Sequence, residues 1–219
     1  MLTFVAKSFV IMSNTAEARA IRPTAILKPS KPPRSYTLEE YLRREERGKE
    51  RHEFYNGIIS KVSMATGPHN IVVANVTAAL VQSFAAQNKP FLVFGSQQLV
   101  YLPDLNFSLY PDILVVAEAP LYWDQNEVLL INPVLVVEVL SKSTRAYDRV
   151  EKFSEYKTLK SFQEYLLVDP YQCRMESRFR EEPDLWREAI VTKLEENITL
   201  KSVGCELQLS DVYRHIKFK

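Results

Sequence analysis

The order of apolar and polar positions from residue 36 onward predicts a helix, a hairpin and a second helix. Residues 38–47 have one apolar edge, Thr37 and Glu40 have the spacing of a capping box, and Gly48 ends the pattern. Asn56-Gly57 lies between two short alternating segments, which is typical of a two-residue hairpin turn. Residues 67–89 follow and predict one long helix.

The middle of the chain changes to strand-like patterns. Residues 91–102 and 108–119 each predict a strand, with a turn at 103–107. Residues 134–140, VLVVEVL, predict a third strand. Apolar positions then recur every three or four residues over 145–160, which predicts a helix, and 163–170 predicts a fourth strand. The segments 173–181, 187–195 and 197–203 predict further short strands.

This order predicts an α/β or α+β fold with an N-terminal hairpin and a C-terminal meander. A strand as uniformly apolar as 134–140 is typical of a sheet that is covered on both faces. We expect a flexible N-terminal arm over residues 1–35, because 22–34 holds four prolines without a clear period, and a single domain over 36–219. The first eleven residues weakly resemble a secretory signal, or else Met12 is the natural start.

Composition limits the classes of function. The formal net charge is +1, so binding to nucleic acid needs a local basic patch. Two segments are candidates for such a basic patch. The first contains Arg43, Arg44, Arg47, Lys49 and Arg51, and the second contains Arg145, Arg149, Lys157 and Lys160. No uninterrupted apolar run reaches the roughly 18 residues of a membrane span, so no membrane partner is expected.

Cysteine and histidine positions point away from disulfides and zinc. Cys173 and Cys205 belong to no CxxC motif, so we expect free thiols in a reducing, cytoplasmic compartment. The three histidines are scattered without the spacing of a zinc finger.

Two carboxylates stand where a buried strand is expected. Glu138 interrupts VLVVEVL and shares one face with Val136 and Leu140, while Asp112 opens the apolar run 113–116. An unpaired buried carboxylate costs several kcal/mol, so such groups are paired, protonated or bound to a metal. A single Asp or Glu at the end of a strand more often pairs with an arginine or caps a neighbouring loop than binds a metal. Together they favour an oxygen-ligand site for Mg²⁺ or Mn²⁺.

Three segments together resemble one known family. YPDILVV, VLVVEVLSKSTRAYDRVEKFSEYKTLKSFQEYLLVDP and HEFYNGIISKVSMATGPHN are similar to the Uma-two family of restriction-endonuclease-like proteins, in the PD-(D/E)XK nuclease superfamily. The resemblance implies a restriction-endonuclease-like core, with a central mixed sheet flanked by helices, and Mg²⁺-dependent cleavage of DNA phosphodiester bonds. It also implies that Glu53, Asp112 and Glu138 are metal ligands and catalytic acids, with the Val139 carbonyl as a further metal ligand.

One position departs from the superfamily pattern. The lysine expected two residues after the glutamate is replaced by Leu140. The resemblance implies that Lys152, on the next helix, supplies the catalytic lysine instead. Asp148, Lys152 and Tyr156 are four residues apart and form one helical stripe, which either faces the site or forms an ordinary surface ion pair.

Some roles stay open at this point. His69 is either a site residue or a surface residue near a helix start, and Tyr156 and Gln98 have similar alternatives. The main hypothesis is a metal-dependent DNA endonuclease that requires no covalent intermediate and joins its basic patches in a homodimer. The alternative is a non-catalytic module on the same fold that binds DNA or a protein.

Overall fold

The computed structural model describes residues 34–218. The predicted arm over 1–35 and the alternative start at Met12 therefore lie almost wholly outside the described residues. Within the described part, the main chain of Tyr36 is already tied to the hairpin, because its N–H donates to the Gly57 carbonyl at 2.9 Å.

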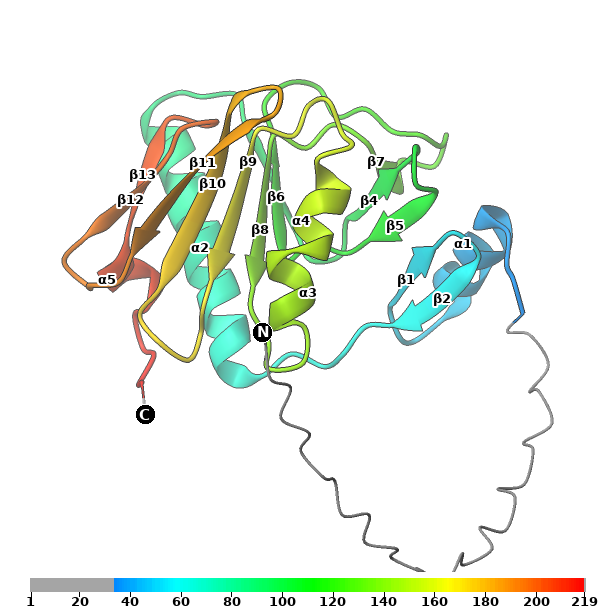
Figure 1. Cartoon of the computed structure of the whole chain (residues 1–219), viewed down its shortest axis with the longest axis horizontal. Helices are drawn as coiled ribbons and strands as arrows, with labels where there is room; N and C mark the ends of the chain where they lie inside the picture. The colour runs from blue at the N-terminus through cyan, green and yellow to red at the C-terminus, as the bar shows by residue number, and fades with distance from the viewer. Residues whose placement is uncertain (1–33, 219) are drawn as a thin grey trace, which may run out of the picture. The chain divides into compact units, whose positions relative to one another are not determined.

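The larger sheet is mixed and has six strands in the order β11–β10–β9–β8–β6–β3 (Figure 1). Only β8 and β9 run parallel within it; the other neighbours are antiparallel. The strands are β3 (Leu92–Gly95), β6 (Ile113–Val116), β8 (Leu135–Val139), β9 (Glu164–Val168), β10 (Met175–Glu182) and β11 (Leu185–Val191). The prediction of an α+β fold with a central mixed sheet is confirmed.

Both faces of this sheet are covered, as the apolar strand predicted. Leu135, Val137 and Val139 of β8 pack in one cluster with helix α2 (Gly67–Ala86) and with β12 (Asn197–Leu200), β13 (Cys205–Gln208) and α5 (Leu209–Val212). Val136 and Leu140 pack in a second cluster on the opposite face, with Tyr156. The alternation of side chains along the strand therefore decides which residues meet which layer.

Helix α2 is long and apolar enough to cross a membrane by length and composition alone. Polar residues such as Asn70 and Asn75 interrupt its apolar positions, so the sequence has no uninterrupted apolar run there. Four residues at four-residue spacing, Val72, Val76, Leu80 and Phe84, are buried and pack against the six-stranded sheet. These contacts are those of a core helix.

The connection from β8 to β9 contains two short helices, α3 (Arg145–Arg149) and α4 (Glu151–Tyr156). The prediction of one continuous helix over 145–160 is wrong in this respect, because the backbone leaves helical geometry at Val150, with φ −122° and ψ −68°. Asp148, Lys152 and Tyr156 are nevertheless all buried, although the helix is broken between the first and the second of them.

A second sheet of five strands has the order β2–β1–β5–β4–β7. Its strands are β1 (His52–Tyr55), β2 (Ile58–Lys61), β4 (Leu99–Leu102), β5 (Phe107–Leu109) and β7 (Leu129–Leu130), and α1 (Leu38–Arg47) packs on it through the stacked rings of Tyr41 and Phe54. The sequence predicted neither this second sheet nor β7 or β13.

The second sheet arises because both strands predicted in the middle of the chain are broken. The turn that follows Gly95 directs β3 into the six-stranded sheet and β4 into the five-stranded one. Pro111, which has no N–H and restricts the preceding residue, separates β5 from β6 in the same way. The chain thus crosses between sheets immediately before Asp112.

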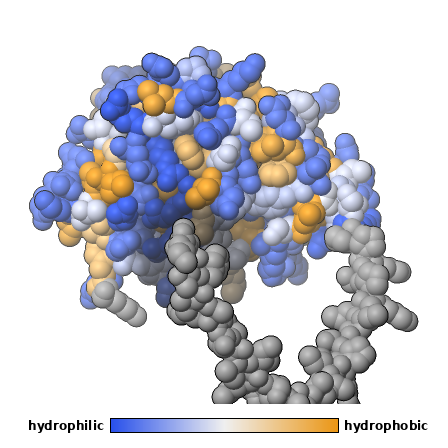
Figure 2. Space-filling model, viewed as in Figure 1, coloured by the Kyte–Doolittle hydropathy of each residue, from blue (hydrophilic) through white to orange (hydrophobic). Residues whose placement is uncertain are grey.

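The predicted local features at the N-terminus are confirmed. Thr37 and Glu40 form both bonds of the capping box. Asn56 and Gly57 have φ values of 43° and 98°, as a two-residue hairpin turn of type I′ requires. In the described residues Cys173 and Cys205 are free thiols, as predicted. Figure 2 shows one face as mostly hydrophilic, with apolar residues in small separate groups.

Candidate active site

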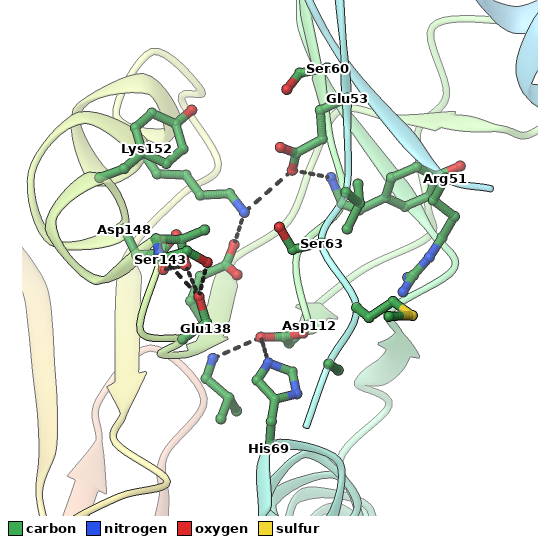
Figure 3. A pocket seen from close by; sticks show the side chains of 18 of the residues that line it. Arg51, Glu53, Ser60, Ser63, His69, Asp112, Glu138, Ser143, Asp148 and Lys152 are labelled. Atoms are coloured by element: carbon green, nitrogen blue, oxygen red, sulfur yellow. Dashed lines mark hydrogen bonds and ion pairs between the residues drawn. The ribbon is translucent and has the colours of Figure 1, made fainter. Parts of the chain in front are cut away.

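Strand pairing brings Asp112 and Glu138 together. β6 and β8 are antiparallel, with Ile113 opposite Val137, so the next position outward places Asp112 opposite Glu138. Directly opposed residues of an antiparallel pair lie on the same face of the sheet with their Cβ atoms about 5 Å apart. Both acids line one pocket (Figure 3).

Asp112 is held by two nitrogen atoms. Its Oδ2 accepts a hydrogen bond of 2.8 Å from the Val139 backbone N–H and lies 3.2 Å from Nε2 of His69. Burial lowers the pKa of His69, but the hydrogen bond and charge of Asp112, with smaller contributions from Asn70 and the Val139 backbone, raise it above its ordinary value. The His69 side chain is 12% exposed and lines the pocket, so the surface alternative is wrong, and a direct role of His69 stays a prediction.

Glu138 is the most deeply placed acid of the site. Its side chain is only 6% exposed, and Oε1 accepts a hydrogen bond of 3.2 Å from the Tyr156 hydroxyl. Burial raises the pKa of Glu138 well above its ordinary value; the Lys152 charge opposes the rise, and Asp112 and Asp148 add to it. A second positive charge in this pocket would therefore stabilise the carboxylate.

Glu53 reaches the pocket from the other sheet. Its Oε1 accepts a hydrogen bond of 3.1 Å from the Tyr110 backbone N–H, and its Oε2 accepts one of 2.6 Å from the Tyr55 hydroxyl. Tyr110 lies in the crossing between β5 and β6, just before Asp112. The first of these bonds therefore links the β1–β2 hairpin to the segment that positions Asp112.

Lys152 lies between two of the acids. Its Nζ is 2.9 Å from Glu138 Oε1 and 3.5 Å from Glu53 Oε1, and its side chain is 7% exposed. Burial lowers the pKa of Lys152, but the two carboxylates raise it well above its ordinary value, so the ammonium stays charged. Leu140 is buried in an apolar cluster, so the cation near Glu138 comes from α4.

The alternative of a surface Asp148–Lys152 ion pair is wrong. The Asp148 side chain is buried, and its Oδ2 accepts a hydrogen bond of 2.5 Å from Thr144 Oγ1. No ion pair between Asp148 and Lys152 is present in the described residues. Asp148 therefore fixes the loop after β8 and adds negative charge to the pocket.

Sequence reasoning missed the hydroxyl groups around these acids. The Tyr147 hydroxyl lies 3.2 Å from that of Tyr55 and 2.6 Å from Glu155 Oε2. Ser141 and Ser143, from the loop after β8, also line the pocket. Their only signal in the sequence was their place beside Glu138 and Asp148 in the segment that carries the family resemblance.

Two expectations from the sequence do not agree with the structure. Gln98 is engaged elsewhere, since its Nε2 donates to the Val128 carbonyl at 2.7 Å. The second basic segment is partly used in structural ion pairs, because Arg149 pairs with Glu176 at 2.5 Å and Arg145 with Asp169 at 3.1 Å. Lys157 and Lys160 of this segment are exposed, as are Arg43, Arg44, Arg47 and Lys49 of the first segment, so a local basic patch stays a prediction.

The donor set suits a hard divalent cation. Four carboxylates (Glu53, Asp112, Glu138 and Asp148) line the pocket together with the cations Arg51, Lys61 and Lys152 and the imidazole of His69. Oxygen ligands of this kind are those that Mg²⁺ and Mn²⁺ prefer. Among residues 34–218, no three His, Cys, Asp or Glu side chains yet stand close enough to hold an ion. Binding therefore requires carboxylates now paired with Lys152 to turn toward a common point.

The chain matches the Uma2 family model, described as a putative restriction endonuclease, over residues 38–211. This protein belongs to the Uma2 family. It is 34% identical over 140 residues to the uncharacterized protein sll1609 of Synechocystis sp., covering 64% of this chain and 78% of that protein. It is 27% identical over 191 residues to a second protein of that organism, slr1290, covering 87% and 97%.

The fold also matches a solved structure, described as a putative nuclease belonging to DUF820 from Anabaena variabilis ATCC 29413. The match has a TM-score of 0.66 and 17% sequence identity, and it covers 81% of this Uma2 chain and 97% of the other. At that identity the likeness establishes the fold alone. Family and fold together support a nuclease function, as the resemblance implied.

Proposed function

We propose that this Uma2 protein is a metal-dependent endodeoxyribonuclease that hydrolyses DNA phosphodiester bonds with Mg²⁺ or Mn²⁺ as cofactor. The observation that carries the proposal is the convergence of Glu53, Asp112, Glu138 and Lys152 in one pocket. They come from four separate elements, and the pocket has a volume of about 660 Å³.

The acids and one carbonyl would hold the ion. Asp112 and Glu138 line the pocket, as do Val139, whose carbonyl would be a further ligand, and Glu53 from the hairpin. A bound divalent ion supplies Lewis-acid activation of a phosphate ester and of a water molecule. The protein contributes the placement of that ion against the sheet edge where the chain crosses to β6.

Lys152 acts as a fixed positive charge. Because Glu138 and Glu53 keep its pKa high, it is unsuited to accept a proton at neutral pH. A buried ammonium that faces the scissile phosphate stabilises the charge that develops on the phosphate oxygens in the transition state. This role needs no covalent intermediate.

A non-catalytic DNA- or protein-binding module remains the second candidate, and one observation favours it. The ammonium of Lys152 already neutralises part of the negative charge of Glu138 and Glu53, so these two acids have an ion-pair partner without a metal. Such a module needs no divalent ion. Metal binding therefore separates the two candidates.

The test is DNA cleavage by the purified protein in Mn²⁺, Mg²⁺ or EDTA. We expect cleavage with either ion, none in EDTA, and none by the Asp112→Ala/Glu138→Ala double variant. The matched control is Asp104→Ala/Glu195→Ala, which removes one exposed acid of each type outside the pocket. If plasmid, single-stranded and branched DNA all stay intact, and calorimetry detects no Mn²⁺ binding, the binding module replaces the enzyme.

A further inference from the structure

We propose that His69 is a metal ligand of this site, which makes it a mixed nitrogen and oxygen centre that prefers Mn²⁺ to Mg²⁺. The inference rests on the metal site of the proposed function and adds a residue and a metal preference to it. Its first support is position. His69 lies at the start of α2, where the Thr66 cap accepts its backbone N–H, and its ring points into the pocket toward Asp112 (Figure 3).

The distance between the two side chains fits a shared ion. His69 Nε2 lies 3.2 Å from Asp112 Oδ2. Neighbouring ligands of an octahedral ion, each about 2.1 Å from it, stand about 3.0 Å apart. An ion bound by both atoms therefore needs little change in their separation. Glu138, opposite Asp112 in the strand register, is a further carboxylate of the same pocket.

The second support is that, among residues 34–218, only Nε2 of the His69 ring has a polar side-chain partner, the Asp112 carboxylate that faces the pocket. Its Nδ1 is buried and has no hydrogen-bond partner among the described residues. Buried polar atoms of structural side chains are nearly always paired. Asp112 does not depend on His69 either, because the Val139 N–H already donates to the same oxygen.

His52 provides the contrast within this chain. It is also buried beside a carboxylate, with its Nδ1 3.2 Å from Glu45 Oε2, but its backbone N–H also donates to Glu45 and, among residues 34–218, neither of its ring nitrogens is left as a buried unpaired atom. His52 thus ties α1 to β1, whereas His69 has one carboxylate contact that faces a pocket.

A nitrogen ligand predicts a metal preference. Both ions accept oxygen ligands, but Mn²⁺ is a first-row transition metal and binds imidazole more readily than Mg²⁺ does. With His69 present, Mn²⁺ should bind more tightly than Mg²⁺, and removal of the imidazole should weaken Mn²⁺ binding by at least about tenfold. Mg²⁺ binding should change less, so the Mn²⁺ to Mg²⁺ affinity ratio should fall.

The experiment is Mn²⁺ binding to the full chain, followed by calorimetry and pulsed electron paramagnetic resonance. We expect ¹⁴N modulation from a directly bound imidazole in the wild type, its replacement by a ¹⁵N signal in uniformly labelled protein, and its loss in His69→Ala and His69→Gln. His215→Asn is the matched control, because it removes an exposed imidazole at a position with φ of 70° that asparagine tolerates.

Each outcome decides one claim. Nitrogen coupling in the wild type and the control, lost in both His69 variants with circular dichroism unchanged, supports the inference. Mn²⁺ that binds without nitrogen coupling overturns the inference and leaves the proposed nuclease standing. If the wild type binds no Mn²⁺, both proposals fail together.

Discussion

At the scale of single residues, the site is a balance of buried charges. Lys152 is the ammonium that lies between Glu138 and Glu53, at the place where each carboxylate would otherwise be buried without a counter-charge. Removing one partner of a buried ion pair costs more than removing both, because the remaining charge stays desolvated.

Lys152→Met tests this balance. We expect the free energy of unfolding at pH 7, measured by urea denaturation in EDTA, to fall by about 3 kcal/mol. The double variant Lys152→Met/Glu138→Gln should recover part of the loss, and so should added Mn²⁺. Lys160→Met, which replaces an exposed lysine of the same segment, is the control. Equal stability of the two single variants would show that Lys152 is not needed as a counter-charge.

A second residue-scale prediction concerns acid stability. Burial raises the pKa of Glu176, but the hydrogen bonds and charges of Arg149 and Arg174 lower it below its ordinary value. A lowered folded-state pKa contributes stability above the unfolded-state pKa, about 4.3, and that contribution is lost as the pH falls through the folded-state pKa.

Glu176→Gln should therefore destabilise the protein at pH 7, and the difference from wild type should shrink progressively below about pH 4. Thermal unfolding from pH 7 down to pH 3 measures it, with Glu195→Gln as an exposed control. A difference that stays constant across this range would refute the assignment of the ion pairs.

At the scale of elements, the β1–β2 hairpin decides whether the site is complete. The hairpin belongs to the five-stranded sheet, yet it supplies Glu53. Its turn depends on Gly57, which has φ of 98°, and a Cβ there would collide with the Ser35 hydroxyl. The geometry of one turn is therefore linked to the position of a candidate ligand.

Gly57→Ala should lower the free energy of unfolding by about 1–2 kcal/mol and weaken Mn²⁺ binding. Gly67→Ala is the matched control, because that glycine has an ordinary φ and open space where a Cβ would lie, so the change should be neutral or stabilising by about 0.5 kcal/mol. Chemical denaturation and Mn²⁺ calorimetry provide both measurements. If Gly57→Ala destabilises without any change in Mn²⁺ affinity, the hairpin does not position Glu53.

At the scale of the whole molecule, the weak net charge bears on the proposed DNA substrate. With a formal charge of +1, the proposed function requires local cations that contact DNA phosphates, and we expect some of them to lie near the pocket. Lys142 is one candidate: it is exposed and lies between Ser141 and Ser143, which line the pocket, with its Nζ 5.4 Å from the centre of the Tyr171 ring.

Lys142→Gln should reduce the slope of log K against log salt for DNA binding by about one. Fluorescence anisotropy in EDTA measures binding without cleavage. Lys193→Gln, on an exposed turn between β11 and β12, should leave the slope unchanged. An unchanged slope for Lys142→Gln would place the DNA path elsewhere.

The homodimer stays a prediction.

Local interactions were enough for the sequence to determine several elements by itself. The capping box at Thr37, the Asn56-Gly57 turn and the two-sided strand around Glu138 each depend on residues close together in the chain. The family segments also indicated Glu53, Asp112, Glu138 and Lys152 before their positions were known.

Only the tertiary structure decided which strands belong to which of the two sheets, and which side chains from them line the candidate site. The strands on either side of Gly95 and of Pro111 enter different sheets, a choice set by which distant strands pair with them. His69 and Asp112 are 43 residues apart in sequence and meet through the packing of α2 against β6 and β8. Side-chain periodicity specifies which face a residue occupies, whereas contacts between faces depend on packing across the whole core.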